Sequence, residues 1–216
     1  MLLLISKYII YFIFYSFVGW LIEVIRIFLR EKKFVNRGFF IGPILPIYGF
    51  GVLFITMLIT GGFNDILSVF LKCVFVCSIL EYVTSYVMEK IFKARWWDYS
   101  NKKFNINGRI CLETMIPFGV LGSLVVIVVH PFVIRSIDYL SDRTTLIIGC
   151  ILGIIFLIDV YLSFSVLIRI KNKIEKSKLD NTEEVRDKVN EWLINNNVFF
   201  KHIANAYPKF KIKRGK

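Results

Sequence analysis

The sequence lacks the common motifs for nucleotide handling and bond hydrolysis. It contains no G-x-x-x-x-G-K-S/T loop, no H-E-x-x-H pair and no G-x-S-x-G turn. These motifs supply the phosphate cradle, the zinc ligands and the activated serine on which ATPases and many hydrolases depend. We therefore do not expect this chain to be an enzyme of these kinds, and we expect no cofactor.

Histidine and cysteine are also scarce. The two histidines and four cysteines show neither a zinc-binding spacing nor a secreted disulfide framework. Cys73, Cys77 and Cys150 fall within apolar stretches, where cysteine packs as a small hydrophobic residue. No metal site is predicted.

Apolar residues, by contrast, are in excess. Hydrophobic side chains make up 56% of the 216 residues, and the mean hydropathy is +0.62. One soluble core cannot bury that much apolar surface, so a bilayer must solvate the remainder. The expected fold class is all-α, a polytopic transmembrane helical bundle that crosses the cell membrane several times.

Apolar runs long enough to cross a bilayer occur about five times. They cover roughly residues 8–28, 44–60, 66–88, 115–133 and 145–168. The second run is the shortest and is interrupted by proline. We divide the chain into a transmembrane helical domain, residues 1–170, and a basic cytoplasmic tail, residues 171–216.

The tail predicts a C-terminal amphipathic helix. Asn181 followed by Glu184 is a helix-start signal, and apolar residues between 185 and 203 form a partial stripe. Our main interpretation is a helix lying on the membrane surface. The alternative is a docking arm for a soluble partner.

Acidic residues are outnumbered, 16 against 28 lysines and arginines, which gives a net charge of +12. The basic residues gather between the first and second runs, between the third and fourth, and in the tail. The positive-inside rule then places the N-terminus outside and the C-terminus in the cytoplasm. Basic groups beside membrane exits meet anionic headgroups, so the predicted partner is the lipid bilayer and not nucleic acid.

The second run begins with irregular composition. Residues 36–51 contain four glycines and two prolines. At bilayer depth such backbone must be buried in protein or line a cavity, because no water is present to satisfy its polar groups. The alternative is an ordinary helix start with proline in the first turn.

Carboxylates inside apolar runs are unfavourable unless they are paired, protonated or facing water. Glu23, Glu81 and Asp159 lie roughly 21–22 Å from the outer ends of their runs, at about 1.5 Å per residue. We therefore expect them to share one layer, which Tyr48 enters from the broken second run. Glu81, Ser85 and Glu89 recur at steps of four on one helix face.

A structural interpretation of these charges stays open. Arg26 lies three residues after Glu23 on the same face. In this interpretation Arg26 reaches the interface, Glu89 lies among headgroups, and Glu23 only anchors the bundle. A solvated helix end is expected at His130-Pro131.

The segment between the third and fourth runs combines rings with polar groups. Trp96, Trp97 and Tyr99 fit an interfacial aromatic belt. The belt leaves a polar set unexplained, which comprises Asp98, Asn105, Asn107, Gly108 and Arg109. Together with Asn36 and Arg37, this set predicts a polar cap over the buried carboxylates.

Several stretches resemble the signature of a bacterial family of putative ABC-transporter permeases, type IV. They are Phe17-Val-Gly-Trp-Leu-Ile-Glu23, Asn36-Arg-Gly-Phe39 with Gly42-Pro43 and Pro46-Ile-Tyr-Gly49, Glu81-Tyr-Val-Thr-Ser85, and Trp96-Trp-Asp-Tyr-Ser100 with Asn105-Ile-Asn-Gly-Arg-Ile-Cys111. The resemblance extends through His130-Pro131, and Ala206-Tyr-Pro-Lys-Phe210 resembles the family's usual ending. It implies a permease-like subunit that moves a solute with energy from a separate ATPase subunit.

These observations define a candidate substrate-binding set. Its members are Glu23, Arg37, Tyr48, Glu81, Asp98, Asn105, Asn107 and Arg109. In the permease hypothesis the glutamates and the tyrosine line the site, and Arg37 and Arg109 gate or neutralise it. A membrane enzyme acting on a lipid, with carboxylates as acid and base, is one alternative. A structural or regulatory membrane protein is the other. A separate ATPase and a second copy of the chain are the candidate protein partners.

Overall fold

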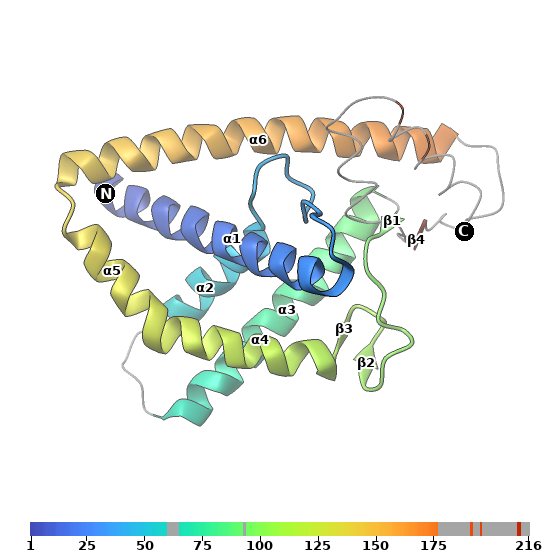
Figure 1. Cartoon of the computed structure of the whole chain (residues 1–216), viewed down its shortest axis with the longest axis horizontal. Coiled ribbons are helices and arrows are strands. Elements are labelled where there is room, and N and C mark those ends of the chain that lie inside the picture. Colours follow the sequence, from blue (N-terminus) through green and yellow to red (C-terminus); the bar gives the residue numbers. More distant parts are fainter. Residues whose placement is uncertain (60–64, 93, 177–190, 192–194, 196–210, 213–216) are drawn as a thin grey trace.

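The structure, a computed structural model, describes residues 1–59, 65–92, 94–176, 191, 195 and 211–212. It is all-α, as predicted (Figure 1). The helices are α1 (Leu2–Glu31), α2 (Pro46–Leu58), α3 (Ile66–Phe92), α4 (Leu112–Leu124), the π-helical η1 (Val125–Val129), α5 (His130–Asp138) and α6 (Asp142–Lys176). Four strands of two residues each accompany them: β1 (Ala94–Arg95), β2 (Asn105–Ile106), β3 (Ile110–Cys111) and β4 (Lys211–Ile212).

Four helices are long and apolar enough to cross a membrane. They are Leu2–Glu31, Ile66–Phe92, Leu112–Asp138 and Asp142–Arg169, and α2 is a shorter apolar helix. These five segments coincide with the five predicted runs. At 1.5 Å per residue α2 is roughly 20 Å long, less than the ~30 Å hydrocarbon thickness. The chain is therefore a multi-pass membrane protein, with four full-length helices and one short one among the described residues.

The irregular segment 32–45 connects α1 to the short helix α2. It turns back into the bundle, and α1 and α3 consequently run in the same direction (Figure 1). The backbone N–H of Leu45 donates to the carbonyl of Ser16, 2.9 Å away, so α2 begins beside the middle of α1. Pro46 stands in the first turn of α2. Both interpretations of this segment find support: proline starts the helix, and the irregular backbone before it bonds to α1 and α6.

Close packing of α1 and α2 explains two of the glycines. A Cβ at Gly49 would lie 2.6 Å from the carbonyl oxygen of Phe12, and one at Gly19 would collide with the ring of Tyr48. Only residues without side chains permit this approach. The glycines therefore bring Tyr48 against α1, at the depth of Glu23.

The fourth long helix corrects one prediction. His130-Pro131 does not end it, because the helix continues to Asp138. Proline cannot donate a backbone hydrogen bond, and the π-helical turn Val125–Val129 directly before it lets the helix pass without a break. His130 is half-buried, and its Nδ1 lies 2.9 Å from the hydroxyl of Tyr15. The expectation of a solvated histidine at a helix end was wrong.

The C-terminal part of the chain is described only in places. The predicted helix start at Asn181 and the stretch Ala206–Phe210 lie outside the described residues. Strand β4 pairs antiparallel with β1, with Ala94 opposite Ile212. Residues 211–212 of the tail therefore lie beside the segment that joins α3 to α4.

Candidate functional site

The segment between α3 and α4 folds into a tight hairpin, which we call the cap and define as residues 94–111. Strands β2 and β3 pair antiparallel, with Ile106 opposite Ile110. Asn107 and Gly108 form the turn with positive φ angles of 52° and 66°. This conformation favours asparagine and glycine, so the Asn-Gly dipeptide determines the turn.

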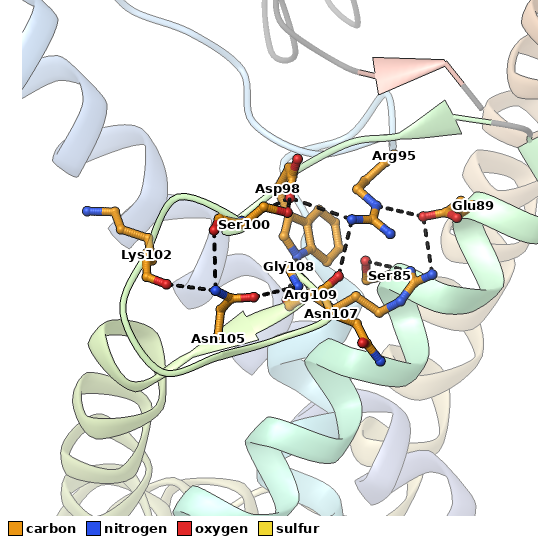
Figure 2. Close-up of polar contacts among 11 residues, drawn as sticks. Ser85, Glu89, Arg95, Asp98, Ser100, Lys102, Asn105, Asn107, Gly108 and Arg109 are labelled. Carbon is orange, nitrogen blue, oxygen red and sulfur yellow. Dashed lines mark hydrogen bonds and ion pairs between the residues drawn. The ribbon is translucent and has the colours of Figure 1, made fainter.

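Two of the predicted polar residues, Asp98 and Asn105, bond to other residues of the cap (Figure 2). Asp98 accepts from the backbone N–H of Ser100 at 3.0 Å and from its hydroxyl at 2.5 Å. Asn105 donates to the Lys102 carbonyl at 2.7 Å and accepts from the Gly108 N–H at 2.9 Å. These side chains therefore shape the hairpin.

A buried ion cluster fastens the cap to α3. Glu89 accepts from Arg95 Nε at 2.7 Å and from Arg109 Nη2 at 3.2 Å, while Arg95 Nη1 lies 3.5 Å from Asp98. Exposed fractions of the Glu89, Arg95 and Arg109 side chains are only 11%, 9% and 7%. Arg109 also donates to Ser85 Oγ at 3.2 Å. The alternative that places Glu89 among headgroups was wrong, because Glu89 is enclosed by two guanidinium groups.

Asn107 and Arg109 extend this attachment across aromatic side chains. The amide of Asn107 donates to the hydroxyl of Tyr82 at 2.9 Å. The guanidinium of Arg109 lies 5.7 Å from the Tyr82 ring centre and 5.3 Å from that of Tyr86. Such distances allow cation–π attraction. The cap is therefore attached to the end of α3 through Asn107 and Arg109.

Glu81 lies deeper on α3 and has a different environment. It is 5% exposed, and it accepts hydrogen bonds from the Tyr99 hydroxyl at 3.1 Å and the Thr114 hydroxyl at 3.3 Å. Burial and the nearby charge of Glu81 raise the pKa of Tyr99, so this donor stays neutral. Within the described part of the chain, no lysine or arginine forms an ion pair with Glu81.

Glu23 is paired with cations. Arg26 donates to it at 2.7 Å, and Arg37 Nε lies 4.0 Å away. The Tyr48 hydroxyl also donates to Glu23, at 3.1 Å. Glu23 and Glu81 lie within electrostatic range of one another. Tyr48 therefore joins the paired carboxylate to the region that Glu81 faces.

Asp159, which was expected in one layer with Glu23 and Glu81, bonds to the backbone of residues 41 and 42. It accepts the backbone N–H groups of Ile41 and Gly42, both at 2.9 Å, and the hydroxyl of Ser163 at 2.8 Å. A Cβ at Gly42 would lie only 2.7 Å from its carboxylate. Asp159 thus satisfies the irregular backbone of residues 32–45 from α6, toward which this segment rises in Figure 1.

A cavity lies between α1, α2, α3 and α4. Its volume is about 100 Å³, where a single water needs roughly 10–15 Å³ on a comparable measure. Most of its walls are aliphatic, and its lining also includes the aromatic Tyr15, Tyr48 and Phe118. Glu81 is the one carboxyl side chain in its lining. The arrangement offers an apolar chamber with one carboxylate.

The structure divides the predicted site residues into two groups. Glu23, Tyr48 and Glu81 gather at or beside the cavity, with Arg37 next to Glu23. Asp98, Asn105, Asn107 and Arg109 belong to the cap. Substrate binding by either group stays a prediction.

The two hydroxyl partners of Glu81 were missed from the sequence. Tyr99 was assigned to an aromatic belt, although its position among the polar cap residues pointed to a second use. Thr114 lies in the first turn of α4 and carries no distinguishing signal in the sequence. Arg95, the second cation beside Glu89, was missed as well.

Comparison with known proteins identifies a family. The model of a family described as putative ABC-transporter type IV matches residues 10–164, which include α1 from residue 10 onward, α2 to α5, the cap and most of the apolar part of α6. No curated protein matches the chain, and no solved structure matches it.

Proposed function

Because the chain belongs to the putative ABC-transporter type IV family, we propose that it is a permease-like membrane subunit that moves a solute with energy from a separate ATPase subunit. The observation that carries this proposal is the cavity between α1, α2, α3 and α4, with Glu81 and Tyr48 in its lining. A chamber inside a helical bundle that offers one convergent charge is a usual form of a small-molecule site.

The route to the cavity is proposed to start at the cytoplasmic side. The cap lies at the same end of the bundle as the C-terminal end of α6, and the segment 32–45 starts from this end (Figure 1). Basic residues concentrate at this end, which supports a cytoplasmic location by the positive-inside rule. Tyr99 connects the cap to Glu81, so a partner that displaces the cap also changes the environment of the carboxylate.

Thiol labelling tests this orientation. Single cysteines at Ser141 and Lys102, both exposed, are introduced in a background without the four native cysteines. In intact cells an impermeant reagent should label the cysteine at position 141 and not the one at position 102. The reverse pattern would place the cap and the tail outside and overturn the proposed route.

Transport is tested by co-purification of a partner and by measurement of solute flux. The full chain is purified from native membranes, and an ATPase subunit should co-purify with it. Solute flux should then require that subunit, and Glu81→Gln should lower flux while leaving co-purification intact. Release of a product from a lipid by the purified chain alone would instead favour the membrane-enzyme alternative.

One observation favours the structural alternative for part of the molecule. The polar residues of the cap satisfy each other and the end of α3. Asp98, Asn105 and Asn107 therefore act in folding whichever function is correct. Unchanged flux in variants of both Glu23 and Glu81 would extend this structural interpretation to the whole chain.

A further inference from the structure

Glu81 is a buried carboxylate whose charge lacks an internal counterpart. Its hydrogen-bond donors are the neutral hydroxyls of Tyr99 and Thr114, and the nearby carboxylate of Glu23 disfavours its charge. An isolated buried charge is strongly unfavourable, and two hydroxyls offset only part of that penalty. The site is therefore incomplete in a way that a positive charge would correct.

The cavity beside Glu81 offers space for a ligand that carries a positive charge. No lysine, arginine or histidine is among the residues that line it. The lining includes the rings of Tyr48 and Phe118, whose centroids are 6.2 Å apart in an edge-to-face arrangement. Aromatic faces around a carboxylate form the usual environment for an organic ammonium group.

We propose that this cavity binds amphipathic organic cations, with the ammonium group at Glu81 beside Tyr48 and Phe118 and the apolar body between α1, α2, α3 and α4. The inference rests on the proposed transport function and specifies its substrate class. The ligand's charge pairs with Glu81, and its hydrocarbon part replaces water against the aliphatic walls.

Other ligand classes fit these walls less well. An anion would meet the carboxyl group of Glu81 without a basic residue in the lining to offset the repulsion. A divalent metal ion requires about six oxygen ligands, whereas this lining offers one carboxylate and tyrosine hydroxyls among aliphatic side chains. A neutral lipid would fill the apolar volume but leave the charge of Glu81 uncompensated.

The test compares a cation with its uncharged carbon analogue. Benzyltrimethylammonium and neopentylbenzene have the same shape and differ in one atom, nitrogen for carbon. Binding of each radiolabelled compound to the full-length chain is measured by equilibrium dialysis in detergent at mildly alkaline pH. We expect the cation to bind at least tenfold more tightly, and Glu81→Gln to abolish that preference.

Two further variants locate the binding and remove the background of partitioning into detergent. A Cβ at Gly51 would approach only Leu80 Cδ1, at 3.8 Å, so Gly51→Leu projects into the cavity and should block both compounds. Phe118→Leu removes a ring and should weaken the cation several-fold more than its analogue. Glu31→Gln, at the exposed end of α1, is the matched control and should change neither.

Each remaining result overturns the proposal. Equal affinity for the two compounds, or a preference that survives Glu81→Gln, would exclude the cationic class. Binding that is unaffected by Gly51→Leu would lie outside this cavity. The transport proposal fails separately, if flux does not depend on an ATPase subunit, so the two failures are distinguishable. Phe118→Leu keeps the test decisive if Glu81→Gln does not fold.

Discussion

Helix α3 carries two largely buried glutamates on nearly the same face, Glu81 and Glu89. The two carboxylates have different partners. Glu89 contacts two guanidinium groups, from Arg95 and Arg109. Glu81 contacts two hydroxyls, and a cavity lies beside it. Burial alone therefore does not identify a functional carboxylate. A functional carboxylate is identified by the groups that compensate its charge.

The cluster around Glu89 is electrically complete. Glu89 and Asp98 supply two negative charges, and Arg95 and Arg109 supply two positive ones. Removal of one member of such a cluster leaves an uncompensated buried charge. Among the described residues no cation pairs with Glu81, so the same substitution there should leave no cation unpaired.

The largest expected effect comes from breaking the complete cluster. Glu89→Gln should destabilise the protein by about 3 kcal/mol, because two guanidinium groups lose their shared carboxylate. Unfolding by denaturant in detergent measures this loss. Glu113→Gln, which removes an exposed pair with Lys102, is the control and should change stability by less than about 1 kcal/mol.

A somewhat smaller effect is expected in the cap's turn. Gly108→Ala places a Cβ at a φ of 66°, where it would collide with Asp98 and Ser100. The loss should be about 2 kcal/mol. Gly153→Ala, whose Cβ would lie 3.6 Å from Ile9 Cδ1, should be neutral or stabilising in the same assay. Equal effects of the two substitutions would show that the turn does not hold the cap.

The sequence predicted the helical part of the fold because apolar runs of membrane length have few other structures available. It also located the irregular, glycine- and proline-rich start of the second apolar run at residues 36–51. It did not predict the continuation of the fourth long helix past His130, because a π-helical turn has no pattern in the sequence. The bond between His130 and Tyr15 joins distant parts of the chain, which local patterns do not report.

The sequence predicted how far along its helix each candidate carboxylate lies. It did not predict which neighbouring element that carboxylate contacts. Counting along the helices placed Glu23, Glu81 and Asp159 in one layer. In the structure Glu81 lines the cavity, and Glu23 bonds to Tyr48, which lines it too. Asp159 turns instead to the backbone of Ile41 and Gly42. Depth follows from position along a helix, whereas the face that a residue presents to its neighbours depends on packing between helices.

The pairing of Glu23 should have a small effect. Double-mutant cycles that combine Glu23→Gln with a substitution of Arg26 or Arg37 should give coupling energies of about 0.5 kcal/mol or less. Arg26 is 60% exposed, and Arg37 lies 4.0 Å from the carboxylate. Coupling of several kcal/mol would place Glu23 in the same structural class as Glu89. The cycle is measured by denaturant unfolding of the four matched variants.

The most direct test of the account is the difference in unfolding free energy between Glu81→Gln and Glu89→Gln, measured in one detergent without added ligand. We predict that Glu89→Gln loses about 3 kcal/mol, whereas Glu81→Gln stays within about 1 kcal/mol of the unmodified chain or is more stable. Equal losses from the two substitutions would contradict the account, because Glu81 would then be as structural as Glu89.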